Sequence, residues 1–253
     1  MPKSPSYIAD HLRRVLVNGA SAPHTEDAQR FFREEVKKRG WRTAELRTVA
    51  RRFTKVIRGQ EGTAYLVEVA KELFRGRGGT NESVPGITSG VTQEEKLLAV
   101  LLLQPCVADF TDEHWPGFDE WLEHANTQAV ADELAKAILG PMLTANPSRA
   151  KSVATWASSP NPWQRRAAAM ALLHGTKRGL LWDEVQQLTN QLLEDPDDTV
   201  QKAVANLLRE ASRYEAPRTV DFLMTIRERA PRGLLRTACA GLSVDERGRV
   251  LGR

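Results

Sequence analysis

Apolar residues recur at intervals of three and four along nearly all of the 253-residue chain, and this spacing constrains the fold more than any other feature. Such a period places apolar side chains on one face of a helix, and the strict alternation typical of half-buried strands is absent. We therefore expect an all-α protein. The predicted helices cover residues 4–18, 25–39, 43–58, 62–74, 92–104, 116–125, 127–144, 147–157, 162–174, 182–194, 197–213, 216–229 and 232–241.

Several helix starts carry residues that cap the first turn. Thr25, Thr43, Thr92 and Asp197 each precede or open an apolar run, and their side-chain oxygens can accept a backbone N–H of that turn. Glu95 follows Thr92 by three residues, which is the capping-box arrangement. We expect these four residues to be N-caps.

The second half of the chain repeats a helical pair. The pairs 147–174 and 182–213 follow each other at about 35–40 residues, a period typical of HEAT-type repeats. We expect residues 1–253 to form a single α-solenoid of antiparallel helix pairs with a concave basic groove. The Gly-rich segment 75–91 departs from this rhythm, either as an ordinary inserted loop or hairpin or as an arm that wraps a ligand.

Composition and motifs exclude several classes of protein. The two cysteines, Cys106 and Cys239, are far apart, the five histidines lack metal-ligand spacing, and no phosphate-binding or dinucleotide-binding signature is present. We therefore expect no metal and no cofactor. The apolar run 97–103 is too short for a bilayer span and no signal peptide is visible, so we expect a cytoplasmic protein without a membrane partner. We also expect a monomer, associated with the bacterial nucleoid.

Cationic side chains gather in stripes although the formal net charge is only +4. Residues spaced by three or four lie on one face of a helix, so such stripes on separate repeats can line one groove and hold a phosphate backbone. The alternative is a set of ordinary solvated helix faces. The candidate residues are Arg47, Arg51, Lys55 and Arg58 in one stripe, Lys202, Asn206, Arg209 and Arg213 in another, and Arg165 and Arg166 after Trp163 in a third.

One carboxylate stands out because it interrupts an apolar stretch. Asp132 lies within residues 129–139, and Gln128 precedes it by one helical turn on the same face. A carboxylate that faces a cationic groove can stabilise a developing positive charge or orient a water molecule. The commoner explanation is a surface aspartate paired with Lys136.

Three spaced segments resemble the AlkD-like DNA alkylation-repair glycosylases. Residues 156–168 (WASSPNPWQRRAA) and 200–210 (VQKAVANLLRE) are similar to two signature stretches of that family, and residues 39–47 resemble its early turn, with Ala44 where proline is usual. The resemblance implies a HEAT-like solenoid that holds duplex DNA and hydrolyses the N-glycosidic bond of cationic purines alkylated at N7 or N3. Such purines already carry positive charge and leave without a strong general acid.

The resemblance also assigns roles to individual residues. The family's catalytic aspartate falls on Asp132 and its phosphate-contacting arginine on Arg166, whereas Gln128 and Asn206 stand where the family has two groove tryptophans. Amides in place of indoles leave space and hydrogen bonds for a larger substrate, so bulky natural-product adducts and a self-resistance role are expected. Two alternatives stay open: a DNA-structure-binding protein without chemistry, and a HEAT scaffold for another protein, whose binding would not depend on salt.

Overall fold

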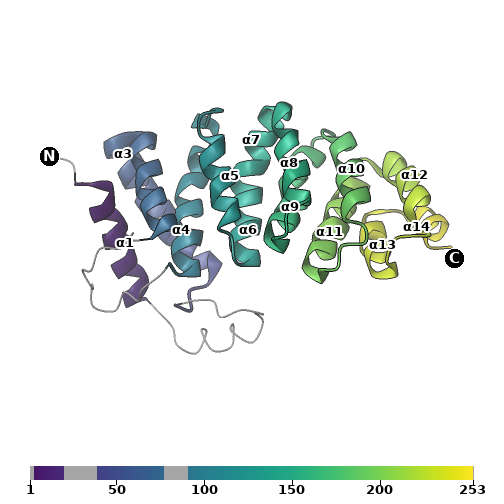
Figure 1. The fold of residues 1–253 in the computed structure, drawn as a ribbon, viewed down its shortest axis with the longest axis horizontal. Helices are drawn as coiled ribbons and strands as arrows, with labels where there is room; N and C mark the ends of the chain where they lie inside the picture. The colour runs from purple at the N-terminus through teal and green to yellow at the C-terminus, as the bar shows by residue number, and fades with distance from the viewer. Residues whose placement is uncertain (1–2, 20–38, 77–90, 253) are drawn as a thin grey trace. The chain divides into compact units, whose positions relative to one another are not determined.

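The computed structural model describes residues 3–19, 39–76 and 91–252, and within these ranges every regular element is helical, which confirms the all-α prediction (Figure 1). The chain divides into two compact units, Met1–Thr111 and Asp112–Arg253, called unit 1 and unit 2 below. The single domain over 1–253 stays a prediction.

The predicted helix 25–39, the cap Thr25 and nearly all of the inserted segment 75–91 lie outside the described residues. None of the described helices is long and apolar enough to cross a membrane.

Unit 1 is built around one long helix. α3 (Thr43–Arg75) packs against α1 (Pro5–Asn18) and α4 (Gln93–Leu103), and a 3₁₀ turn, η1 (Gln104–Asp109), follows α4. The two helices predicted at 43–58 and 62–74 join into α3 across a break at Gly62, whose φ of 85° is accessible to glycine at little cost.

Three of the four predicted N-caps lie within the described residues and can be compared with the structure. The hydroxyl of Thr92 accepts the backbone N–H of Glu95 at 3.3 Å, and the carboxylate of Asp197 accepts that of Thr199 at 2.7 Å, which confirms both. The prediction for Thr43 is wrong because α3 already begins at that residue, and the Glu45 carboxylate accepts the backbone N–H of Arg42 at 2.8 Å instead. A side chain inside the helix thus replaces the expected cap.

Unit 2 contains the repeated helical pairs. The helices α7, α9, α11 and α13 pack side by side in this order, and α8 and α10 contact α9 while α10 and α12 contact α11. The contacts α8–α9 and α10–α11 are the two pairs expected from the 35–40-residue rhythm. The elements are α5 (Trp115–Glu123), α6 (Gln128–Leu134), the π-helical turn η2 (Ala135–Leu139), α7 (Gly140–Ala145), η3 (Pro147–Arg149), α8 (Ala150–Ala157), α9 (Pro162–Thr176), α10 (Trp182–Leu192), α11 (Asp198–Tyr214), α12 (Ala216–Ile226), α13 (Arg232–Ala238), η4 (Cys239–Gly241) and α14 (Val244–Leu251).

The helix α14 was not predicted from the apolar pattern. It starts at a capping box in which Ser243 and Glu246 bond reciprocally, with Glu246 N–H to Ser243 Oγ at 3.3 Å and Ser243 N–H to Glu246 Oε2 at 3.0 Å. The Ser-x-x-Glu pattern was visible in the sequence, but only Val250 of this helix is buried. A short helix with one buried residue gives almost no periodic signal.

The predicted helix 127–144 is a continuous run from α6 through η2 to α7, with a wide π turn in its middle. Pro141 explains the turn, because a proline in a helix has no N–H to donate and its ring clashes with the carbonyl four residues earlier. Gly140 explains the close packing beside it: a Cβ there would lie 2.6 Å from the backbone oxygen of Ala171 in α9. Because the turn is wide and Gly140 has no side chain, α9 packs closely against this helix.

Unit 1 also holds a buried network of charged residues. The Arg13 guanidinium lies 2.8 Å from Asp10 and 3.3 Å from Glu95, whose other oxygen lies 3.2 Å from Arg39. Glu94 accepts the backbone N–H groups of Arg39 at 2.9 Å and Gly40 at 3.0 Å. Arg13 and Glu95 are each 2% exposed, so this network ties α1 and the segment before α3 to the start of α4.

Candidate functional site

Asp132 and Arg166 form a two-point ion pair in unit 2. Arg166 donates from Nε to Oδ1 of Asp132 at 2.7 Å and from Nη2 to Oδ2 at 2.8 Å. The residues are 9% and 6% exposed, respectively. A bidentate pair of this kind fixes the plane of the carboxylate as well as its position. Two residues separated by 34 positions, both singled out from the sequence, are therefore in direct contact.

The starts of three neighbouring helices create this contact. Thr127 caps α6 and Asn161 caps α9, so Asp132 and Arg166 are each the fifth residue of their helix and lie at equal depth. Arg166 also donates from Nη1 to the backbone oxygen of Thr199, in the first turn of α11. Arg166 therefore joins α6, α9 and α11 near their N-termini.

The Asp132 carboxylate keeps room for another partner. Lys136 lies one helical turn further on, with its Nζ 3.8 Å from Oδ2, and is exposed, as is Gln128 one turn earlier. A carboxylate offers about four lone-pair directions, of which Arg166 takes two. The pairing with Lys136 exists, but the shorter and buried pairing with Arg166 dominates the surroundings of Asp132.

Arg165 has a different environment from its neighbour in sequence. Its guanidinium lies 2.6 and 3.1 Å from the two carboxylate oxygens of Asp195, and it also donates to the backbone oxygens of Ser159 and Pro160. Asp195 in turn accepts the backbone N–H of Asp197, the cap of α11, at 2.9 Å. Arg165 thus links the segment before α9 to the segment before α11. Trp163, two residues earlier, is half-buried.

The polar stripe predicted on α11 faces a hollow of ≈ 520 Å³ between α11 and α13. Lys202 is exposed there, Asn206 and Arg209 are half-buried, and Arg209 donates to the amide oxygen of Asn206. The other side of the hollow includes Leu234 and Thr237 of α13. Cationic, amide and apolar groups are therefore available side by side on this surface.

The remaining predicted cations lie in unit 1, on α3. Arg47 is half-buried, and its Nη1 donates to the side-chain oxygen of Gln104 at 3.2 Å. Arg51 is exposed and lines a hollow of ≈ 580 Å³ together with Lys55 and Arg58, and Arg58 lies 2.7 Å from Asp109. The stripe expected from the spacing of four and three is thus present on the surface of unit 1.

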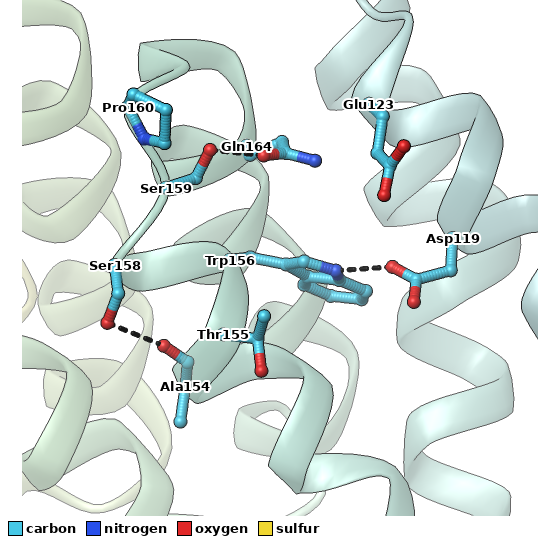
Figure 2. A pocket seen from close by; sticks show the side chains of 9 residues that line it. All are labelled: Asp119, Glu123, Ala154, Thr155, Trp156, Ser158, Ser159, Pro160 and Gln164. Atoms are coloured by element: carbon cyan, nitrogen blue, oxygen red, sulfur yellow. Dashed lines mark hydrogen bonds between the residues drawn. The ribbon is translucent and has the colours of Figure 1, made fainter.

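Another hollow of unit 2, of ≈ 660 Å³, lies between α5 and the α8–α9 segment and contains none of the predicted site residues (Figure 2). Asp119 and Glu123 line one side, and the Trp156 indole N–H donates to Asp119 at 2.6 Å. Two carboxylates disfavour a phosphate, so this hollow does not fit a polyanion.

The two cysteines of the chain are poorly suited to act as nucleophiles. Burial raises the pKa of the Cys106 and Cys239 thiols, so both stay protonated near neutral pH and are poor nucleophiles. No group of three or more His, Cys, Asp or Glu side chains suited to a metal ion occurs among the residues described.

Sequence reasoning missed a set of charges at the far end of α9 and α11. Glu210 is 7% exposed and faces three cations: Arg213 at 2.9 Å, Arg209 at 3.5 Å and Lys177 at 3.9 Å. The stripe on α11 contained Arg209 and Arg213, but Lys177 lies directly after the end of α9. Only the packing of α9 on α11 brings it close to Glu210, and no local pattern encodes that contact.

Comparisons with known proteins agree with the geometry. No curated protein sequence matches the chain significantly. A solved structure described as a "predicted DNA alkylation repair enzyme" from Enterococcus faecalis is similar, with a TM-score of 0.71 at 14% identity, over 89% of this chain and 97% of that one. This likeness shows the fold. The family model described as "DNA alkylation repair enzyme" matches residues 12–242, and the chain therefore belongs to the DNA alkylation repair enzyme family.

Proposed function

We propose that this protein is a DNA glycosylase that hydrolyses the N-glycosidic bond of purines alkylated at N7 or N3 in duplex DNA. The observation that carries the proposal is the Asp132–Arg166 pair, a fixed carboxylate beside exposed Lys136 and Gln128, in a member of a DNA alkylation repair family. The reaction needs no redox step and no group donor.

The chemistry follows from the charge of the substrate. Alkylation at N7 or N3 makes the purine cationic, so the electron pair of the breaking C1′–N bond neutralises the leaving base. The sugar becomes an oxocarbenium ion, which the Asp132 carboxylate stabilises electrostatically. Water adds to C1′ and its proton passes to solvent. Asp132 orients this water through a lone pair that Arg166 does not occupy.

Arg166 supports this chemistry by holding Asp132. Two of its donors bind the carboxylate and a third binds the Thr199 carbonyl, so its plane is fixed by two neighbouring helices. We assign it first a positioning role, with a phosphate contact through its remaining N–H groups as a second role. Lys202 and Arg209 of α11 and Arg47 and Arg51 of α3 contact the DNA backbone in this proposal.

We include bulky adducts in the substrate class. Gln128 is exposed beside Asp132, and Asn206 lies at a hollow of ≈ 520 Å³, so the positions where the resembling family carries tryptophans offer amide hydrogen bonds and open space. A substrate with a large substituent fits such a surface better than a small methyl group does. A role in resistance to DNA-alkylating natural products would follow.

The test is release of purine from alkylated duplex DNA by the purified protein. One substrate should carry N7-methylguanine and N3-methyladenine, and another a bulky N7 or N3 adduct. We expect the wild type to release purine above the spontaneous rate from at least one of them, and the Asp132→Asn variant to lose this activity. If the wild type releases neither kind of base, the glycosylase proposal fails.

A second candidate function is duplex binding without chemistry. The Asp132 charge is already compensated by a bidentate pair with Arg166 and by Lys136, which is also what a purely structural carboxylate shows. That alternative predicts tight, salt-dependent duplex binding without base release, and no effect of Asp132→Asn on either.

A further inference from the structure

The cluster of Lys177, Arg209, Glu210 and Arg213 has more positive than negative charge. Three cations, two on α11 and one at the C-cap of α9, face one buried carboxylate at 2.9, 3.5 and 3.9 Å. One negative charge cannot balance three positive charges, so the cluster keeps a net charge of about +2. An excess of this kind is favourable only where water or an anion compensates it.

The cations of this cluster remain accessible. The side chains of Lys177, Arg209 and Arg213 are 47%, 36% and 53% exposed, whereas the side chain of Glu210 is 9% exposed. The carboxylate therefore lies beneath the three cations and draws them together from below. Their outer sides face solvent.

Arg209 also has a donor without an acceptor. Its Nη2 donates to Asn206, but its Nε is buried and has no hydrogen-bond partner. A buried unpaired donor is costly and rare in folded proteins. Because this Nε is buried, a bound anion would reach it only if the Arg209 side chain shifted, and the anion would then supply the missing acceptor.

From these observations we propose that the cluster is a phosphodiester-binding subsite, in which Glu210 is a positioning residue that gathers Lys177, Arg209 and Arg213 around one phosphate of a nucleic-acid backbone. The inference rests on the proposed function for the identity of the anion as DNA. Arginine and lysine donors that converge on one point suit a phosphate, which offers several acceptor oxygens.

The subsite is separate from the Asp132 site. Arg166 lies on α9 and Lys177 is the C-cap residue directly after it, eleven residues further on, which corresponds to about 16 Å at a rise of about 1.5 Å per residue. Successive phosphates of one strand are separated by about 3.4 Å along the duplex axis. The two sites therefore contact different phosphates, and the subsite binds DNA at a distance from the reacting sugar.

The experiment measures the salt dependence of binding to undamaged duplex DNA, using the full chain. Each phosphate contact contributes about 0.9 to the slope of log K against log salt. Because the cluster binds one phosphate, we expect the Lys177→Gln/Arg213→Gln double variant to lower the magnitude of this slope by about one and to weaken binding roughly tenfold near 0.15 M salt. Lys177→Gln alone should lower it by less than the double variant does, because Arg209 and Arg213 still contact the same phosphate.

The matched control is Arg227→Gln, which removes one partly exposed arginine from the end of α12, paired with Glu228 at 3.0 Å. Its slope should equal that of the wild type. If Lys177→Gln and the double variant fold like the wild type and share the slope of Arg227→Gln, the subsite does not exist. Because the probe is undamaged DNA, this result is independent of base release, so the glycosylase proposal and the subsite can fail separately.

Discussion

Two regions of this molecule pair arginine with a carboxylate in opposite ways. In unit 1, Arg13 and Arg39 share Glu95, and Glu94 accepts backbone N–H groups beside them, in a closed network whose members are 9% exposed or less apart from Asp10 at its edge. In unit 2, Arg166 holds Asp132, but exposed Gln128 and Lys136 lie one turn before and one turn after it. The closed network of unit 1 stabilises the fold. The Asp132 carboxylate is also held in place, by Arg166, but one of its sides stays open to a substrate.

The largest expected effect tests the closed network. Glu95→Gln removes the charge shared by Arg13 and Arg39 and leaves two buried cations undercompensated, so we expect the free energy of unfolding to fall by about 3–5 kcal/mol. Urea denaturation followed by circular dichroism measures this change. Glu68→Gln, which removes one partner of the exposed Glu68–Lys71 pair, is the control and should cost less than about 1 kcal/mol. Equal effects of the two variants would contradict the distinction between closed and open networks.

The open pair should respond in rate, and also in stability because loss of the Asp132 charge leaves the buried Arg166 guanidinium undercompensated. Asp132→Asn keeps the size of the side chain but removes the charge that stabilises the oxocarbenium ion, so we expect the single-turnover rate of base release to fall about 10²- to 10³-fold. Duplex affinity should be at least that of the wild type, because a negative charge is lost near the DNA. Glu123→Gln, in the hollow of Figure 2, is the control and should keep the wild-type rate. Retention of full activity by Asp132→Asn would rule out the proposed role of Asp132.

Arg166→Lys separates positioning from phosphate binding. Lysine keeps the charge but cannot form the two-point pair, so we expect base release to slow about tenfold through looser placement of Asp132, with little change in the salt slope of binding. Arg165→Lys is the matched comparison, since Arg165 binds Asp195 and loop carbonyls and should affect stability more than rate. A lower salt slope with an unchanged rate would show that Arg166 is chiefly a phosphate contact.

The smallest expected effect is on the pH dependence of folding stability. Burial, followed by the charges of Arg178 and Lys177, lowers the pKa of His174 in the folded protein, where its Nδ1 lies 3.0 Å from the Thr144 hydroxyl. The unfolded chain therefore binds a proton more readily, and stability should fall as the pH drops below the ordinary value of about 6.5. His174→Gln should remove this part of the pH dependence, as measured by thermal unfolding between pH 5 and 8. An unchanged pH profile would contradict it.

The helices and the residues of the pair could be predicted from sequence, but the contacts between helices could not. Apolar spacing located most helices of unit 2, and a carboxylate within a largely apolar stretch, together with the family resemblance, indicated Asp132. The engagement of Arg165 with Asp195 was not visible, because adjacent arginines look equivalent in a sequence and differ only through the loop that each one reaches. Lys177 joined Glu210 only through the packing of α9 on α11, which local patterns do not encode.

The π turn at Ala135–Leu139 makes the site sensitive to the length of the chain. The turn holds one residue more than a regular helical turn, and each residue of a helix rotates its neighbours by about 100°. Deletion of one residue between Asp132 and Gly140 could restore an ordinary helix without loss of helical content. It would turn Asp132 by about a quarter of a revolution relative to α7 and α9, away from Arg166. Family members that differ in length by one residue here would therefore keep the fold but lose this ion pair.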